Sequence, residues 1–236
     1  KIILKIMKVA AFSDSHGCLN SENSIYGLPI IEDDTNLVCI AGDIIPLDIQ
    51  KNMHLSEIWF SENFLRWAKE CPAEKIVFIG GNHDFWFEDN DTKIKSLIYT
   101  NDLTDKVEYL HNSYCTYNGL TIFGTPYVKN LVNWAFYSPN LKKTFSLIDN
   151  CDILITHQPP NIDKVGCSYP YLVYERNFGS DSLREVLDNK SIKVNICGHI
   201  HSGVHDGVKY VDTTVYNVSL LNENYTHAYN VTYFEI

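Results

Sequence analysis

The sequence predicts one α/β domain over residues 1–236, and three observations support this fold class. Short apolar runs alternate with segments of helical periodicity, as in sheets that helices cover. The length fits one large domain, and no linker, repeat or low-complexity tract divides the chain. Hydrophobic residues make up 45% of the chain and charged residues 20%, a composition typical of globular rather than disordered proteins.

Five apolar runs have the length and composition of buried strands. Each is rich in Val, Ile or Phe and is bounded by polar residues or Gly, which is typical of strands covered on both faces. In chain order, these predicted strands are residues 9–12, 37–41, 75–80, 151–156 and 193–197.

Two segments between these strands have the pattern of helices. Apolar residues over 53–69 recur at helical spacing, and Pro72 closes that segment. Ser182 followed by Glu185 has the pattern of a capping box, so we expect a helix that begins there and reaches about Asn189.

The middle and the end of the chain have the pattern of further strands. Residues 114–117 and 120–124 flank Asn118 and Gly119, a pair that favours the tight type I′ turn of a hairpin. The last thirty residues are rich in Val and Tyr, and we expect this β-rich tail to form part of a second sheet.

The acidic balance of the chain excludes two classes of partner. There are 19 Lys and Arg against 29 Asp and Glu, which gives a formal charge of −10 and a pI near 5.3. A surface that grips long nucleic acid or an anionic membrane carries the opposite charge, although a small positive site remains compatible. No apolar run approaches the ~20 residues of a membrane span. We therefore expect neither a membrane nor long nucleic acid as a partner.

The cysteines and the N-terminal run favour a cytoplasmic protein. Seven cysteines are scattered along the chain without a CxxC pair, which is typical of reduced thiols in the cytosol. The run around Met7 is basic and apolar, but Lys5 and Lys8 interrupt it and no small-residue cleavage site follows. We expect a strand that ends near Phe12 rather than a signal peptide.

Polar motifs follow each of the five predicted strands. In open α/β sheets, side chains just beyond the carboxyl ends of strands can converge although they lie far apart in the sequence. Five of the nine histidines fall in these motifs, beside Asp and Asn. The candidate site residues are Asp14, His16, Asp43, Asn82, His83, Asp84, His157, His199 and His201.

The residue types of these motifs predict a metal centre. Two carboxylates, four imidazoles and one carboxamide, with no thiolate, suit a pair of divalent cations, whereas structural zinc favours Cys-rich sets. We expect extended backbone in Asp14-x-His16 and in His199-x-His201, since a spacing of two then points both side chains to one face. Each pair is predicted to reach a single cluster.

Together, the five motifs resemble those of the calcineurin-like metallophosphoesterase superfamily. The motif set of that family is D-x-H, G-D, G-N-H-[DE], H and G-H-x-H, and all five occur in order between Asp14 and His201. The shorter runs GTPY at 124–127 and WAF at 134–136 resemble the metallophosphoesterase-domain-containing branch, which is related to fetal-brain 239-type proteins.

The resemblance implies a four-layer αββα sandwich, in which helices flank two mixed sheets, and a dinuclear metal centre with Asp43 as the bridging ligand. Mn²⁺ is the expected metal, with Fe, Zn and Ni as alternatives. The resemblance implies that one ion is bound by Asp14, His16, Asp43 and His201. It implies that the other is bound by Asp43, Asn82, His157 and His199.

The implied activity is hydrolysis of a phosphate ester by a hydroxide that bridges the two metals, with His83 as the acid that protonates the leaving oxygen. Asn82 and Asp84 share its motif and complete the expected catalytic set. Asp84, Asp43 or a backbone carbonyl is expected to hold the His83 ring. The family often has a further Asp where this chain has Pro46, so the orientation of His83 stays open.

The narrower branch implies a phosphodiesterase that acts on a cyclic nucleotide or a similar small diester. A phosphomonoesterase is the alternative, and a non-catalytic scaffold that binds a protein partner is the third hypothesis. Asp14 and Asp43 could instead cap turns, and His157 could be a buried structural residue. The aromatic residues near the motifs could stack on a nucleobase or belong to the core. These are Tyr127, Trp134, Phe136, Tyr137 and residues 85–87.

Overall fold

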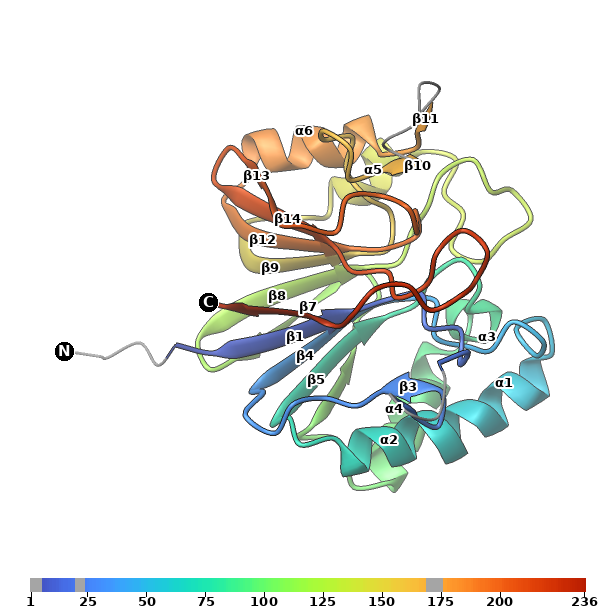
Figure 1. Cartoon of the computed structure of the whole chain (residues 1–236). Coiled ribbons are helices and arrows are strands. Elements are labelled where there is room, and N and C mark those ends of the chain that lie inside the picture. The colour runs from blue at the N-terminus through green and yellow to red at the C-terminus, as the bar shows by residue number, and fades with distance from the viewer. Residues whose placement is uncertain (1–5, 20–23, 169–175) are drawn as a thin grey trace.

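Two β-sheets pack face to face, and helices cover both outer faces (Figure 1). This computed structural model describes residues 6–19, 24–168 and 176–236. The order of the layers is helices, sheet, sheet, helices, and each sheet is mixed. The predicted four-layer αββα sandwich is therefore confirmed.

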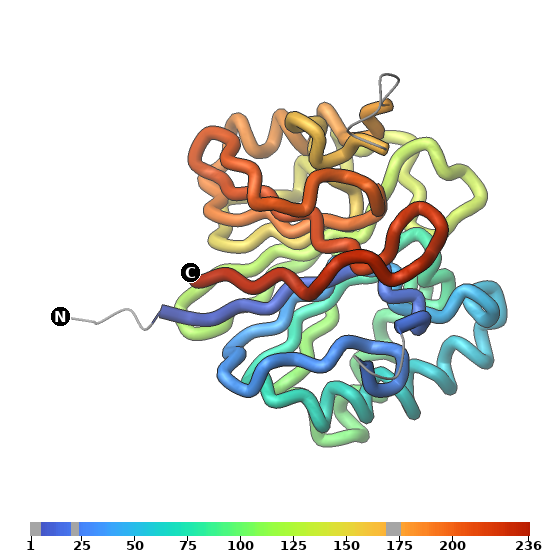
Figure 2. Tube along the Cα trace, viewed as in Figure 1, coloured from blue at the N-terminus to red at the C-terminus, as the bar shows by residue number. Residues whose placement is uncertain are grey.

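The first sheet has the strand order β15-β1-β4-β5-β6. β1, β4, β5 and β6 run parallel, and β15 is antiparallel to β1. Figure 2 shows this C-terminal strand beside the N-terminal one. The strands are Lys8–Phe12 (β1), Leu37–Ala41 (β4), Lys75–Ile79 (β5), Val107–Tyr109 (β6) and Thr232–Glu235 (β15).

The second sheet has the order β13-β14-β12-β9-β8-β7. Its four central strands are parallel, and the outermost strands β7 and β13 are antiparallel to their neighbours. Asn118 and Gly119 join β7 to β8 with φ of 47° and 85°, both positive, as the predicted type I′ turn requires. The strands are Ser113–Tyr117 (β7), Leu120–Thr125 (β8), Cys151–Thr156 (β9), Ile192–Cys197 (β12), Val208–Tyr210 (β13) and Thr213–Asn217 (β14).

The helices divide between the two outer faces, as Figure 1 shows. Against the first sheet lie Met53–Trp59 (α1), Phe60–Phe64 (the π-helical turn η1), Leu65–Glu70 (α2), Phe85–Glu88 (α3) and Asp91–Thr100 (α4). Against the second lie Leu141–Phe145 (α5) and Asp181–Asn189 (α6). α1, η1 and α2 follow one another without a break, which confirms the helix predicted over 53–69. Ser24–Ile25 (β2) with Leu28–Pro29 (β3), and Cys167–Ser168 (β10) with Arg176–Asn177 (β11), form two small antiparallel pairs.

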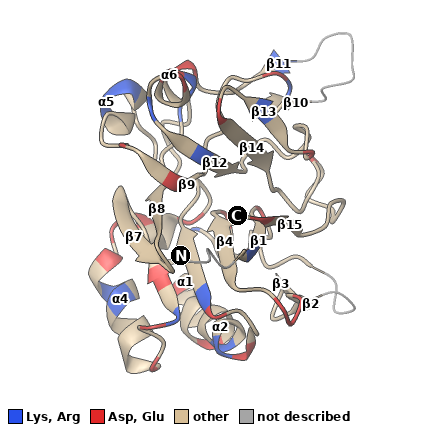
Figure 3. Ribbon diagram, turned by 90° about the vertical axis from the view of Figure 1, so that its left-hand side faces the viewer, with Lys and Arg blue, Asp and Glu red and all other residues tan. Residues whose placement is uncertain are grey.

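Side chains of the central strands alternate between two apolar layers. On β1, Val9 and Ala11 face the second sheet, while Ala10 and Phe12 face the helices. All four are fully buried. This two-sided burial explains why the strands are continuous apolar runs in the sequence. Charged residues lie mostly on the outer helices and the connecting loops, with both signs interspersed (Figure 3).

One prediction for the fold is corrected, and another is made more precise. Helix α6 is capped by Ser180, whose hydroxyl accepts from the backbone N–H of Leu183 at 3.2 Å, and not by Ser182. The backbone N–H of Ser180 donates to the backbone oxygen of Pro159 at 2.8 Å, which holds Ser180 in an extended conformation. This tertiary contact therefore fixes where the helix begins. The tail forms part of the second sheet through β13 and β14, as predicted, and its last strand, β15, pairs with β1 in the first sheet.

Candidate metal centre

The nine predicted site residues lie at one edge of the two sheets, in the turns that follow β1, β4, β5, β9 and β12. Eight of them are buried and His199 is half-buried. Hydrogen bonds connect turns from both sheets, for example His157 with Asn82 and His199 with Asp14. The structure therefore brings together side chains that lie up to about 190 residues apart in the sequence.

The backbone of these turns is left-handed rather than extended, so the predicted reason for the convergence was wrong. The φ angles of Asp14, His16, Asp43 and His199 are 52°, 45°, 56° and 69°. Hydrogen bonds hold the turns in this strained region, including Asp14 N–H to Gly42 O at 3.0 Å and His16 N–H to Asp43 O at 3.1 Å. Asp14, His16 and His201 nevertheless point into one group.

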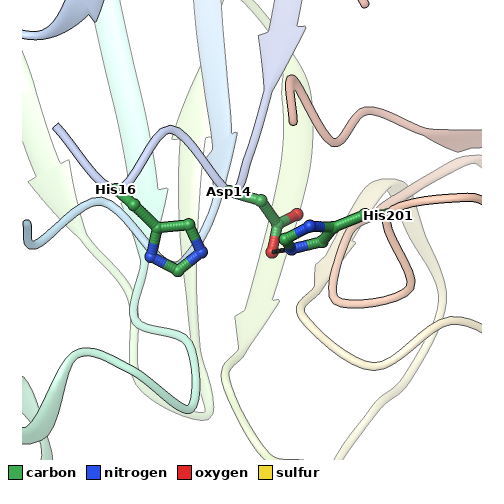
Figure 4. A group of neighbouring side chains, drawn as sticks. All are labelled: Asp14, His16 and His201. Atoms are coloured by element: carbon green, nitrogen blue, oxygen red, sulfur yellow. Dashed lines mark ion pairs between the residues drawn. The ribbon is translucent and has the colours of Figure 1, made fainter. Parts of the chain in front are cut away.

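The first half of the centre consists of Asp14, His16 and His201 (Figure 4). Their candidate ligand atoms all lie within 4.8 Å of one another, and Nε2 of His201 lies 3.3 Å from Oδ1 of Asp14. The other ring nitrogen of His201 donates to the backbone oxygen of Asn222 at 2.9 Å. Ser219 donates its hydroxyl to Oδ2 of Asp14 at 2.7 Å. Partners outside the cluster thus fix the orientation of both side chains.

The second half is built around Asp43 and His157. Nε2 of His157 lies 3.2 Å from Oδ2 of Asp43 and 3.0 Å from Oδ1 of Asn82. Nδ1 of His157 donates to the backbone oxygen of Ala41 at 2.7 Å, which leaves Nε2 to face the cluster. The ring of His199 lies 5.0 Å from the ring of His157, measured between centroids.

The residues present fit a divalent metal pair. Both ring nitrogens of His16 are buried, and neither has a hydrogen-bond partner among the described residues. Buried polar atoms are normally paired, so nitrogens left open beside two carboxylates suit coordination. Two glycines also leave space for the carboxylates of the centre. A Cβ on Gly81 would lie only 2.2 Å from Oδ1 of Asp43, and a Cβ on Gly198 only 2.4 Å from Oδ2 of Asp14, so any other residue would clash there.

The histidines of the centre divide into two electrostatic kinds. Burial lowers the pKa of His157 and His201, but the carboxylates of Asp43 and Asp14 outweigh it and raise each pKa to about 9. Burial dominates at the other two, lowering the pKa of His16 to about 4 and that of His199 to about 3. Without cations, therefore, two protonated imidazoles neutralise the two buried carboxylates.

This electrostatic balance predicts how the metal-free protein responds to pH. A histidine whose pKa rises from 6.5 to about 9 on folding stabilises the fold fully below pH 6.5, and this contribution is lost as the pH rises to 9. The melting temperature of chelated protein should therefore fall between pH 6.5 and 9, by about 2–4 °C for each kcal/mol lost in a chain of this size. Calorimetry of chelated His201→Asn, which lacks one of these groups, should show a shallower fall. A constant or rising melting temperature in chelated wild-type protein would contradict the assignment.

The His83 ring is hydrogen-bonded to Gln50, and not to Asp84 as the sequence suggested. Nδ1 of His83 lies 2.6 Å from Oε1 of Gln50, whereas Asp84 accepts backbone N–H groups of Asp43, Ile44, Ile45 and Gly81 at 2.7–3.1 Å. Asp43 accepts the backbone N–H of His83 at 2.7 Å, not its ring. None of the three expected partners therefore holds the imidazole. Both oxygens of Asp84 accept backbone N–H groups instead.

Some of the aromatic residues near the motifs belong to the hydrophobic core, and others lie beside the metal centre. Phe136, Trp86 and Phe87 are buried in the core under the first sheet, which settles the structural interpretation for them. Trp134 and Phe85 are half-buried, and the Trp134 ring lies 4.4 Å from that of His83, between centroids. This second pair can therefore meet a molecule bound beside His83, whereas Tyr127 and Tyr137, both among the described residues, are half-buried and no ring contact with His83 is found for them.

Sequence reasoning missed several residues that complete the site. Ser219 and Asn222 fix the first half of the centre, and Gln50 holds His83. The ring of Tyr225 lies 5.3 Å from the rings of both His16 and His201, between centroids. These residues lie outside the five motifs, and nothing in a single sequence distinguishes them from ordinary polar loop residues.

Comparison with known proteins identifies the family. The model of calcineurin-like phosphoesterases matches residues 7–203, a range that contains every candidate site residue. The chain therefore belongs to the calcineurin-like phosphoesterase family, as its five motifs predict.

The curated relatives confirm the narrower branch. Metallophosphoesterase domain-containing protein 1 of Homo sapiens, like that of Mus musculus, is 28% identical over 244 residues, which cover 90% of this chain and 66% of the relative. A UPF0046 protein of Caenorhabditis elegans is 26% identical over 230 residues, which cover 80% of this chain and 51% of the relative. The chain thus spans about half to two thirds of the length of these proteins.

Solved structures support the fold alone. A phosphopantetheinyl hydrolase from Mycobacterium tuberculosis superposes with a TM-score of 0.57 at 12% identity, covering 94% of this chain and 92% of that one. A second crystal structure superposes with a TM-score of 0.60, also at 12% identity, over 90% of both chains. Within the described ranges, no helix has the length and apolar character needed to cross a membrane.

Proposed function

We propose that this domain is a phosphoesterase that depends on two divalent metals, with Asp43 as the ligand shared between them. The observation that carries the proposal is the position of a single oxygen, Oδ2 of Asp43. It lies 3.2 Å from Nε2 of His157 and 3.9 Å from Nε2 of His16, so imidazoles from both sheets converge on it. The full proposed ligand set is Asp14, His16, Asp43 and His201 for one ion, and Asp43, Asn82, His157 and His199 for the other.

The charge of the site fits an anionic substrate. Two divalent cations carry four positive charges, and the carboxylates of Asp14 and Asp43 carry two negative ones. The loaded site is therefore positive, although the chain has a net charge of −10. Mn²⁺ is the metal we propose, and Fe, Zn or Ni would suit the same nitrogen and oxygen donors. Once bound, the pair supplies an activated water and neutralises charge on the phosphoryl oxygens.

His83 is proposed to donate the proton to the leaving oxygen. A ring nitrogen of His83 lies within 4.8 Å of the ligand atoms of His16 and Asp43, so the ring borders the centre. Its backbone N–H is tied to Oδ1 of Asp43 at 2.7 Å, which couples its position to the shared ligand. General-acid catalysis from such a position typically contributes roughly 10²–10⁴-fold. Asn82 precedes His83 and brings its carboxamide to His157.

The surroundings of His83 support a phosphodiesterase acting on a cyclic nucleotide or a similar small diester. Trp134 and Phe85 offer half-buried rings, and Nζ of Lys51 lies 5.2 Å from the centroid of Trp134 and 5.6 Å from that of Phe85. Aromatic rings can stack on a base, and an ammonium group can meet a phosphate oxygen. We place this activity in the cytoplasm, a proposal supported by the scattered spacing of the seven cysteines, which include no CxxC pair.

Chelation followed by the return of Mn²⁺ tests the proposed function. Metal-free protein should hydrolyse neither p-nitrophenyl phosphate nor bis(p-nitrophenyl) phosphate, and Mn²⁺ should restore turnover, with the diester preferred. Metal content measured on the same samples should show two ions per chain.

Other outcomes select the alternatives. Turnover of the monoester alone would replace the diesterase by a phosphomonoesterase. Protein that binds two metals but cleaves neither ester would remove the enzymatic interpretation and favour the scaffold.

A further inference from the structure

The carboxamide of Gln50 has a defined orientation. Its nitrogen donates to the backbone oxygen of Leu47 at 2.9 Å, so its oxygen is the atom that faces His83. That oxygen, Oε1, lies 2.6 Å from Nδ1 of His83. Because a carboxamide oxygen only accepts hydrogen bonds, Nδ1 must carry the hydrogen. In the neutral ring, the lone pair is then on Nε2.

Other contacts restrict the His83 ring to one position. The ring packs 4.4 Å from Trp134 and 4.7 Å from His16, between centroids, and the backbone N–H bonds to Asp43. Only Gln50, however, bonds to a ring nitrogen among the described residues. Packing can therefore hold the plane of the ring, but the choice between its two tautomers and its two flipped orientations depends on Gln50.

We infer that Gln50 is a positioning residue that sets the tautomer and orientation of His83. The inference rests on the proposed function for its kinetic consequence. As the bond from phosphorus to the leaving oxygen breaks, its electron pair goes to that oxygen, which takes the Nε2 proton of the doubly protonated His83 ring and leaves a neutral ring with its lone pair on Nε2. Nδ1 keeps its hydrogen on Oε1 of Gln50 throughout, since a neutral carboxamide does not take up the proton.

The sequence position of Gln50 is consistent with this role. Pro46, three residues after Asp43, offers no side-chain acceptor to the ring. Gln50 lies four residues further on, in the turn before α1, and lines an open cavity of about 700 Å³ together with Asp48 and Lys51. A carboxamide thus reaches the ring from a neighbouring part of the same loop.

Spectroscopy on metal-free protein tests the inference without catalysis. At a pH where the ring is neutral, NMR correlation spectra of the histidine ring nitrogens should show His83 protonated on Nδ1, with His83→Gln used to assign its signals. Gln50→Leu, which keeps the approximate volume but removes the acceptor, should shift the population toward the Nε2-protonated form. Gln50→Glu restores an acceptor at the same place and should retain the Nδ1-protonated form.

Kinetics on the Mn²⁺-loaded protein give the second readout. Gln50→Leu should lower kcat for a diester with an alkyl leaving group by roughly 10–100-fold, and that for a nitrophenyl leaving group by less than about threefold, because a good leaving group needs little protonation. KM should stay unchanged. Gln50→Glu should recover most of the rate. Asp48→Asn, in the same loop and cavity, is the control and should behave as wild type.

The two proposals can fail separately. If loaded wild-type protein cleaves no ester, the proposed function fails, while the ring-nitrogen spectra still decide the role of Gln50. If wild type is active but Gln50→Leu slows both leaving groups equally, or leaves the His83 tautomer unchanged, Gln50 does not position the imidazole and the inference is overturned.

Discussion

Replacing Asp43 by Asn is expected to remove both metals and to reduce phosphoester hydrolysis by roughly 10³-fold or more. Two imidazoles converge on Oδ2 of Asp43, and Oδ1 accepts the backbone N–H of His83. A neutral carboxamide is a poor bridging ligand for two cations, and each 1.4 kcal/mol of lost charge stabilisation corresponds to about a tenfold loss of rate. Metal content by mass spectrometry and turnover of bis(p-nitrophenyl) phosphate measure the two effects.

A matched control separates this effect from the general loss of a carboxylate that accepts a backbone hydrogen bond. Asp152 lies at the other end of β9 from the centre, accepts the backbone N–H of Thr121 at 2.8 Å and pairs with Lys193. Asp152→Asn should therefore lower stability slightly and keep both ions and the rate. If Asp43→Asn retained two metals per chain, Asp43 would not bridge them, and the proposed centre would need another shared ligand.

The predictable part of the fold is the part governed by two-sided burial. β4 and β9 are runs of apolar residues because, in each sheet, helices cover one face and the opposite sheet covers the other. Both strands begin and end where the sequence predicts. The partner of β15 could not be predicted in this way. Its pairing with β1 is a backbone interaction between the two ends of the chain, and hydrophobic pattern carries no information about it.

The same distinction applies to the site. Residue types and positions after strands were enough to place Asp14 and His201 in one group. The left-handed backbone of Asp14 and His16 was not predictable, because it is imposed by hydrogen bonds to the turn after β4. Gln50 and Ser219 were missed for a related reason. Each acts through a single side-chain hydrogen bond to a motif residue, and such a bond leaves no periodicity or spacing in the sequence.

The corrected role of Asp84 leads to the second large effect. Its carboxylate is fully buried and accepts the backbone N–H groups of Asp43, Ile44, Ile45 and Gly81. It therefore fastens the turn after β4 to the turn after β5, and that connection holds Asp43 in place. Burial and the nearby charge of Asp43 raise the pKa of Asp84 to about 8, so this anchor is retained at an electrostatic cost.

Asp84→Ala is expected to unfold more easily and to lose metal, although Asp84 is not proposed as a ligand. Each buried N–H group left without an acceptor costs about 1–3 kcal/mol, so a loss of roughly 3–5 kcal/mol is expected once the turn relaxes. In a chain of this size, that corresponds to a fall in melting temperature on the order of 10 °C. Calorimetry measures the melting temperature and mass spectrometry the metal content, with Asp89→Ala, a change at an exposed residue, as the control.

A carboxylate that acted through the His83 ring would behave differently, since its removal would slow esters with poor leaving groups at nearly unchanged melting temperature. That pattern would restore the catalytic role predicted from the sequence, whereas joint loss of stability and metal would establish Asp84 as the anchor of the bridging ligand.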